Sequence, residues 1–406
     1  MKPVFPRRVE HPSTLDLHAE RMQLNWGPSH PATHGTLRIQ LELDGETIVK
    51  CDTEIGYLHR GFEKLGEVLD YNKIVNLTDR LNYCSIFMNN VGWHLACEKM
   101  FGIEAPERAQ YLRVILSELA RIGDHMPAIG PNCVDIGAFS PMLWLWNLRE
   151  EIYDILENVT GARMTTSFTR VGGLWMDVHD GFEAQVRAVL PHVHSTLDEL
   201  TRLMANNRIF NDRTRGVGAL SAEEAISYGW TGPCLRACGV PHDLRVDNPY
   251  MVYGDLDFDI PVGEHGDVYD RFFVRVEECR QSVRIIEQCL DKLPEGPVIS
   301  DTKLAVLPIK KEVYGEMEGL IHHFEIVING PQAPKGAVCY HATEAANGEL
   351  GFTIVSNGKG VPYRMRIRPP CFYIFSALPR VITGQLVADL SATLASINII
   401  AGELDR

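Results

Sequence analysis

The sequence lacks three features that would each have pointed to a definite class of protein. It has no excess of positive charge, since its formal net charge is −14 at pH 7, and this argues against non-specific binding of nucleic acid through a basic face. It has no apolar run near the roughly 20 residues that a membrane-spanning helix requires; the longest candidates are residues 369–379 and 390–402. Residues 1–8 also lack the apolar segment of a secretory signal.

Paired cysteines are missing as well. The chain has ten cysteines, all scattered, and none forms a Cys-x-x-Cys motif; Cys234 and Cys238 are the only close pair. Dispersed cysteines in a large chain of this composition are typically reduced, buried side chains. The absence of Cys-x-x-Cys argues against a site that holds a soft metal ion through thiolates.

The order of hydrophobic patterns predicts an α+β fold with a central helical bundle. Apolar residues alternate over 37–43, a turn follows at Asp44 and Gly45, and residues 48–55 return as a second strand. Helical spacing dominates from about 62 to 210 and from about 267 to 293. Further strands are predicted at 323–328, 337–341, 351–356 and 363–367, before a helical segment at about 380–400.

These patterns give a domain plan. We predict an extended arm over residues 1–20 and one domain over 21–406, divided into a β region (21–61), a helical bundle (62–300) and a small sheet with a C-terminal helix (301–406). The charged residues at the very end, from Glu403 to Arg406, are also compatible with a frayed, solvated tail.

The segment Trp26-Gly-Pro-Ser-His-Pro-Ala-Thr-His-Gly35 carries two imidazoles on a loop that cannot be an α-helix. Pro28 and Pro31 fix their φ angles and remove two N–H donors. His30 and His34 are therefore held in set directions, as proton chemistry or ligand binding requires. Two histidines hydrogen-bonded to the backbone of a structured loop would give the same pattern.

Three other short segments combine titratable groups with apolar neighbours. Residues 54–64 (EIGYLHRGFEK) present the cationic Arg60, either near a negative partner or on a charged helix start. Residues 79–84 (DRLNYC) place Tyr83 in an apolar run, where its hydroxyl requires a partner if buried. Residues 132–137 (NCVDIG) place Asp135 in a predicted apolar loop between two helices. A carboxylate there must be paired or protonated, and a histidine is a natural partner.

Taken together and in order, these segments resemble one family. GPSHPATHG, EIGYLHRGFEK, RLNYCS, VTGARM with RVGG, RIRPPCF and the terminal SATLASINIIAGELDR match the 49 kDa subunit, also called the D subunit, of NADH:quinone oxidoreductase (respiratory complex I), from about residue 20 to the end. That family is similar to the large subunit of nickel–iron hydrogenases, so the resemblance implies a hydrogenase-large-subunit-like fold. Without Cys-x-x-Cys, the metal pocket is expected to be empty and reused for another ligand.

The resemblance implies which residues serve that ligand. A quinone headgroup, expected to be ubiquinone, would lie between His34 and Tyr83, which supply the two protons of its reduction. Asp135 would orient His34 and stabilise its charged form. Arg60 would lie close to the terminal iron–sulfur cluster, which the neighbouring B subunit holds. This chain would hold no metal or flavin, because FMN and the iron–sulfur clusters belong to partner subunits.

The resemblance also implies a setting. The expected partners are the B, C and I subunits and the membrane-embedded H subunit, in a complex that couples quinone reduction to proton translocation. The chain would be peripheral on the cytoplasmic side of a bacterial inner membrane, or on the matrix side of a mitochondrial one. Thr165 departs from the family, in which many members have histidine at this position.

Two other functions stay open on the sequence alone. One is a non-catalytic scaffold subunit of a related hydrogenase-like membrane complex that binds no quinone. The other is a soluble metal hydrolase that uses His30, His34 and His59.

Overall fold

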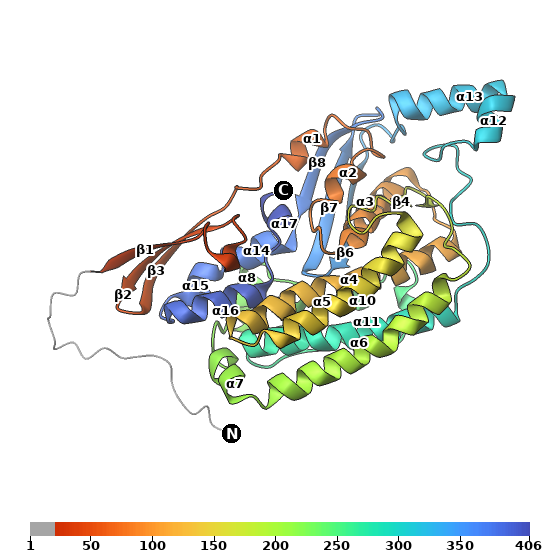
Figure 1. Ribbon diagram of the computed structural model, residues 1–406. Coiled ribbons are helices and arrows are strands. Elements are labelled where there is room, and N and C mark those ends of the chain that lie inside the picture. The colour runs from red at the N-terminus through yellow and green to blue at the C-terminus, as the bar shows by residue number, and fades with distance from the viewer. Residues whose placement is uncertain (1–20) are drawn as a thin grey trace.

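The computed structural model describes residues 21–406; the predicted arm over residues 1–20 lies outside the described residues. The first element is an antiparallel sheet of β1 (Met22–Trp26), β2 (Arg38–Asp44) and β3 (Thr47–Glu54), which lies at one end of the molecule (Figure 1). Ile39, Leu41 and Leu43 are buried as their alternation predicts, and the turn uses Gly45 with a positive φ of 59°. The predicted hairpin is confirmed.

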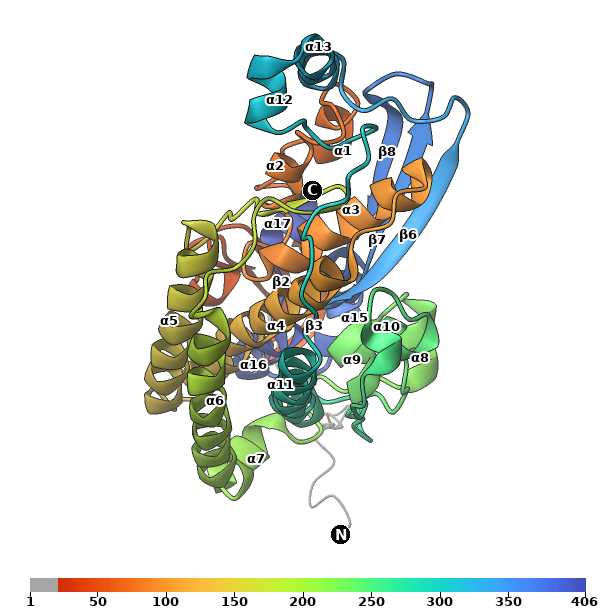
Figure 2. The ribbon, with the colours of Figure 1, turned by 90° about the vertical axis from the view of Figure 1, so that its right-hand side faces the viewer.

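Long helices form the body of the molecule. They are α3 (Ile86–Phe101), α4 (Glu107–Asp135), α5 (Ser140–Thr160), α6 (Phe182–Ala205) and α11 (Val268–Asp291). The main hydrophobic core lies between α4, α5, α6 and α11, which run side by side in Figure 1; in Figure 2, α11 is seen nearly end-on. The predicted helical bundle is confirmed, and with the small sheets it gives the predicted α+β class.

Helix α4 is longer than the sequence pattern predicts. Asp135 is not in a loop, because it is the last residue of α4, which continues through Pro127 and Pro131. Each proline removes one helical hydrogen bond. Packing offsets this loss, because the end of α4 lies against α16 (Val387–Ile397) and Asn132 Nδ2 donates a hydrogen bond to the Ala392 carbonyl at 3.1 Å.

The second large sheet is antiparallel and consists of β6 (Val338–Ala345), β7 (Gly348–Ser356) and β8 (Pro362–Arg368). Helix α3 packs on it. These strands confirm three of the four predicted ones. The fourth, at 323–328, is wrong: the chain there forms the end of α13 (Met317–Phe324) and a π-helical turn, η3 (Glu325–Asn329). Its β-branched residues have no neighbouring strand to pair with, and β-propensity depends on such pairing.

The remaining elements are short: η1 (Pro31–Thr33), α1 (Phe62–Leu65), α2 (Val75–Thr78), β4 (Thr169–Arg170), β5 (Gly173–Leu174), α7 (Arg208–Thr214), α8 (Ala222–Ser227), α9 (Gly232–Ala237), α10 (Leu244–Asp247), η2 (Tyr253–Asp255), α12 (Lys310–Gly315), α14 (Pro370–Ser376), α15 (Leu378–Ile382) and α17 (Ala401–Asp405). Helices α12 and α13 project from the body of the molecule (Figure 1).

The C-terminus is not a solvated tail. All five residues of α17 are buried, and α17 packs against α14 in the middle of the molecule (Figure 1). The alternative of a frayed end is therefore wrong. The apolar run that precedes α17 leads the chain inward rather than out to water, and Leu404 within α17 is buried in the same core.

Candidate functional site

Tyr83 lies in a tight segment between α2 and α3 that Asn82 holds in shape. The Asn82 side chain is buried; its Nδ2 donates to Asp124 Oδ2 at 2.6 Å, and its Oδ1 accepts from the backbone N–H groups of Cys84 and Ser85 at 3.0 and 3.3 Å. These bonds satisfy polar groups that burial would otherwise penalise. The segment is therefore fixed, and Tyr83 has a set direction.

The Tyr83 side chain is half-buried. Burial raises the pKa of its hydroxyl to about 12, and nearby Cys84, Cys371 and Asp124 contribute to the same shift. Tyr83 is thus a neutral proton donor throughout the physiological range. It borders a cavity of about 10 Å³, whose other lining residues are Cys84, Ile86, Phe87, Ala120, Tyr153, Leu156, Arg163, Met164 and Thr166. This volume is that of about one water molecule.

Helix α17 lies directly against the Tyr83 segment because Gly402 has no side chain. A Cβ atom on Gly402 would lie 2.2 Å from the Arg80 carbonyl oxygen and 2.6 Å from that of Leu81. Both are backbone atoms, so neither can turn away. Glycine is required here for close approach of two backbones, and this contact places the end of the chain next to Tyr83.

The same helix fixes the loop that carries Arg60. The Asp405 carboxylate accepts from the backbone N–H groups of Gly56 and Leu58 at 2.8 and 2.7 Å, and its carbonyl oxygen lies 2.7 Å from His59 Nδ1. Arg60 itself is exposed, with its guanidinium 5.8 Å from the Phe62 ring centre. Within residues 21–406 it makes no ion pair, so the negative partner considered for it is absent there.

A larger cavity of about 430 Å³ opens on this side of α17. It is lined by Ile55, Gly56, His59, Gly61, Glu63, Lys64, Arg364, Phe372, Leu404, Asp405 and Arg406. Its volume is in the range of small-molecule pockets. Helix α17 therefore borders both this cavity and the segment of Tyr83.

The two loop histidines have different environments. The His30 ring stacks on Trp26 with ring centres 4.0 Å apart, its Nδ1 accepts from the Ala32 N–H at 3.2 Å, and burial lowers its pKa. His34 follows the 3₁₀ turn in a left-handed conformation with φ of 51°. Its side chain is exposed and makes no hydrogen bond within the described residues. His30 thus has a structural role, whereas the His34 imidazole is open to a ligand.

The loop that carries His34 and the segment of Tyr83 both pack against one large core cluster. Ala32, close to His34 in the loop, packs against the cluster of buried side chains that also supports Tyr83 and Cys84. Between residues 21 and 406 no ion pair within 4.0 Å joins His34 to Asp135, so the structure does not bring the predicted pair together. Burial raises the pKa of the half-buried Asp135 carboxyl to about 6, as expected for an acid without a close cation.

Three further buried groups behind Tyr83 do not stand out in the sequence. Asp124, Cys371 and Glu403 are each fully buried and come from α4, α14 and α17. Asp124 Oδ1 also accepts from Asn398 Nδ2 at 3.1 Å. The signal that would have found Glu403 is the apolar run before it, which leads into the core rather than to solvent. Thr165, the departure from the family, is exposed and has a left-handed φ of 53°.

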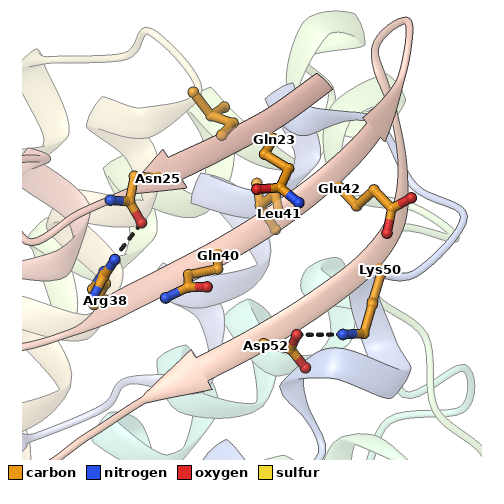
Figure 3. Close-up of a pocket in the computed structure, with 9 residues that line it drawn as sticks. Gln23, Asn25, Arg38, Gln40, Leu41, Glu42, Lys50 and Asp52 are labelled. Atoms are coloured by element: carbon orange, nitrogen blue, oxygen red, sulfur yellow. Dashed lines mark hydrogen bonds and ion pairs between the residues drawn. The ribbon is translucent and has the colours of Figure 1, made fainter. Parts of the chain in front are cut away.

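A groove over the first sheet is a separate feature. Figure 3 shows a hydrogen bond between Arg38 on β2 and Asn25 on β1, and an ion pair between Lys50 and Asp52 within β3. Arg38 Nε donates to Asn25 Oδ1 at 3.1 Å, and Lys50 Nζ lies 2.5 Å from Asp52 Oδ2. Arg38 also forms an ion pair with Glu54 at 3.1 Å. Since both cations already have carboxylate partners, we assign no ligand to this groove.

Two kinds of feature are missing from residues 21–406. None of their helices combines the length and the apolar character needed to cross a bilayer. Nor do three histidine, cysteine, aspartate or glutamate side chains gather there as they would around a metal ion. His30 and His59, which a metal hydrolase would need together with His34, each engage a backbone group separately.

Comparison with known proteins gives a consistent result over nearly the whole chain. Residues 135–406 match the family described as respiratory-chain NADH dehydrogenase, 49 Kd subunit. The chain is 54% identical to a D subunit of the NADH-quinone oxidoreductase of Sorangium cellulosum, with 97% of each chain covered. It is 52% identical to the D subunit of the NADH-quinone oxidoreductase of Myxococcus xanthus, covering 98% of this chain and 96% of the relative.

A third relative is a longer protein. The combined C/D subunit of the NADH-quinone oxidoreductase of Bdellovibrio bacteriovorus is 52% identical over 96% of this chain, which spans 70% of the relative. The name of this relative joins two subunits in one protein. The family match and the identities above 50% together show that this chain belongs to the 49 kDa subunit family of the respiratory-chain NADH dehydrogenase, as its motifs predicted.

Proposed function

We propose that this chain forms the quinone-headgroup site of a proton-translocating NADH:quinone oxidoreductase. The observation that carries the proposal is Tyr83, a neutral phenol with a set direction at the edge of an apolar cavity. A quinone has two carbonyl acceptors across a flat apolar ring. A phenol on one side and an imidazole on the other can donate to both carbonyls, and each can give up a proton when the ring is reduced.

His34 is the second donor in this proposal. Its exposed ring on a proline-restricted turn faces no protein partner among the described residues, so a ligand carbonyl can take that place. Asp135 stabilises the charged form of His34 once the loop has approached the end of α4. The cavity beside Tyr83 holds about one water, so the ring binds in the space between Tyr83 and the His34 loop, after that space has opened.

The electrons come from outside this chain. NADH reduces FMN in one partner subunit, and iron–sulfur clusters carry the electrons to the last cluster, in the B subunit. Arg60, an exposed cation on a loop anchored by Asp405, contacts that subunit near the cluster, where positive charge favours the reduced form. The C, I and membrane-embedded H subunits complete the surroundings, and this chain is peripheral on the cytoplasmic side of the inner membrane, or on the matrix side in a mitochondrion.

A scaffold function is the second candidate, and the small cavity is the observation that favours it. If the space between Tyr83 and His34 never opens, this chain holds partner subunits together without contacting quinone. Both functions require assembly into the complex, but only the first requires the phenol and the imidazole.

Replacing Tyr83 by Phe and His34 by Ala separates the two. In membranes that contain the assembled complex, we expect each variant to lose at least about 100-fold in NADH:quinone turnover, the usual size of a proton-transfer contribution. NADH oxidation by ferricyanide, which takes electrons before the quinone, should be unchanged. His30→Ala is the matched control on the same loop. Full quinone turnover in both variants would favour the scaffold.

A further inference from the structure

Glu403 is a buried carboxyl group with no hydrogen bond of ordinary geometry. Its side chain is fully buried in α17, and neither of its two oxygen atoms has a partner that meets hydrogen-bonding criteria. Burying a carboxylate without partners is costly, so the group takes up a proton instead. An unpaired acid of this kind, kept in the core next to a proposed reaction site, suggests a role in proton transfer.

The surroundings of Glu403 connect it to Tyr83. The Cys371 sulfur, on α14, accepts from the Ile400 N–H just before α17 at 3.5 Å and donates to the Asn398 carbonyl at 3.7 Å. Cys371 also acts on the pKa of both Glu403 and the Tyr83 hydroxyl. The backbone of Ala401, two residues before Glu403, also acts on the Tyr83 hydroxyl through a hydrogen bond that lowers its pKa. Gly402 holds α17 against the Tyr83 segment, so the buried acid and thiol lie behind the half-buried phenol in the same core cluster.

The other charges around Glu403 come from three elements. Asp124 on α4 disfavours a second negative charge and raises the pKa of Glu403, whereas Arg368 at the end of β8 lowers it. The charge of Glu403 also contributes to the raised pKa of the Cys84 thiol, in the Tyr83 segment. Burial is the largest cause, and together these effects raise the pKa of Glu403 to about 7. Protonated and ionised forms are therefore both accessible at physiological pH.

We infer that Glu403 holds the proton that restores Tyr83 after Tyr83 has protonated the reduced quinone, with the Cys371 thiol as the bridge between them. The inference rests on the proposed function and adds a residue that acts through Tyr83 without touching the substrate. It makes the end of the chain part of the proton path.

The proton balance is simple. Two electrons from the partner's iron–sulfur cluster, one proton from Tyr83 and one from the charged imidazolium of His34 convert the quinone to quinol. This leaves a tyrosinate and a neutral His34 imidazole, which takes up its next proton from water. The Cys371 S–H gives its proton to the tyrosinate oxygen as the Glu403 O–H gives its own to the sulfur. Glu403 ends as a carboxylate and takes a proton from water before the next turnover. Transfer from an acid with a pKa of about 7 to a phenol with a pKa of about 12 is downhill.

Glu403→Gln in the assembled complex tests the inference, because glutamine keeps the size of the side chain but carries no transferable proton. In the wild type we expect NADH:quinone turnover to fall above pH 7 as Glu403 ionises. In Glu403→Gln we expect turnover at pH 6.5 to be at least about tenfold lower and this alkaline fall to be absent. Glu403→Asp should restore the alkaline fall. Ferricyanide reduction at the flavin reports assembly in every variant.

Infrared difference spectra give a readout that a structural role would not move. Reduction of bound quinone should remove a protonated-carboxyl band in the wild type and in Glu403→Asp, but not in Glu403→Gln. Cys371→Ser, which keeps a hydroxyl in place of the thiol, should retain most of the turnover, and Cys371→Ala should lose it. These cysteine variants test the path even if Glu403→Gln fails to assemble.

Different results would overturn the role of Glu403 and the proposed quinone site. If Tyr83→Phe abolishes quinone turnover while Glu403→Gln keeps the wild-type rate, pH profile and infrared band, the role of Glu403 is overturned and the quinone site stands. If Tyr83→Phe itself is fully active, the proposed function fails, and with it the acceptor of the Glu403 proton.

Discussion

Asp135 combines a cost in stability with a proposed role in turnover. Burial raises its pKa to about 6, above the ordinary 3.8, so the folded chain binds this proton more tightly than the unfolded chain does. The free energy of unfolding therefore falls as pH rises from about 4 to about 6, and the loss persists above pH 6. A side chain that is partly open to water keeps this loss to about 1 kcal/mol.

We expect Asp135→Asn to remove that cost and to impair turnover at the same time. At pH 7.5 the variant should raise the melting temperature of the purified complex slightly and lower NADH:quinone turnover at least about tenfold, whereas near pH 4 the stability gain should vanish. Gains in stability with loss of activity are characteristic of functional sites. Asp212→Asn, at an exposed ion pair, is the control. Normal turnover in Asp135→Asn would remove Asp135 from the mechanism.

Residue types predicted part of the site and missed the rest for a physical reason. Tyr83 was recognisable because a phenol in an apolar run must find a partner. Glu403 does not stand out in the sequence, because a charged residue near a chain end is usually solvated. Its burial depends on α4 and α14, which come from other parts of the sequence. His34 and Arg60 stand out in the sequence as well, but their roles come from the resemblance to the family and stay predictions.

At the scale of elements, α17 and the Tyr83 segment depend on one glycine. Gly402→Ala would place a Cβ 2.2 Å from the Arg80 carbonyl oxygen, so one of the two backbones must move. We expect Tyr83 to be displaced and quinone turnover to fall about tenfold or more, since small misplacements at a reacting site have effects of this size. Ferricyanide reduction by the assembled complex should be unaffected.

Gly123→Ala is the matched control for this change. Gly123 lies inside α4, has no positive φ, and a Cβ there would meet nothing within 4 Å. Alanine should stabilise α4 by roughly 0.5–1 kcal/mol and leave turnover unchanged, as measured by thermal unfolding and by NADH:quinone assay. Equal effects of the two alanines would show that the contact of Gly402 with Arg80 is unimportant.

Periodicity predicted most elements correctly and failed where tertiary contacts decide. The alternation in β2 and the spacing in α4 reflect faces that are buried in the structure. The run at 323–328 has strand-forming residues but no partner strand, and it continues a helix instead. The pattern predicts a loop at Asp135, whereas α4 continues to that residue and its end is held by contacts with α16.

At the scale of the molecule, exposed apolar side chains gather on the arm formed by α12, α13 and η3, which projects from the body. Ile309, Tyr314, Met317 and Ile328, between α12 and η3, are each more than 60% exposed, and the arm stands away from the body in Figure 2. Apolar patches of this kind usually mark contacts with other proteins. This agrees with a chain that is one component of a larger assembly.

The interior is joined by a network of buried charges centred on Arg236 of α9. Its guanidinium lies 2.8 Å from Glu278 on α11, 2.8 Å from Glu344 on β6 and 3.3 Å from Asp243 beside α10. Burial alone would raise the pKa of Glu278, but Arg236 and the contact with His125 lower it to about 2. One arginine thus contacts acids from three elements, and Arg245 supplies a second cation to Asp243.

Removing that arginine should therefore affect the whole molecule. Arg236→Met leaves the buried Glu278 and Glu344 without their guanidinium, whereas Asp243 keeps its ion pair with Arg245 at 2.7 Å. Breaking a buried ion pair in this way typically costs about 3–5 kcal/mol. We expect a lower melting temperature and less assembled complex, with the defect partly relieved at low pH, where the uncompensated acids take up protons. Arg208→Met, at a pair whose arginine side chain is 94% exposed, should change stability by less than about 1 kcal/mol. Similar melting temperatures for the two variants would mean that the elements are joined by apolar packing and that the network contributes little.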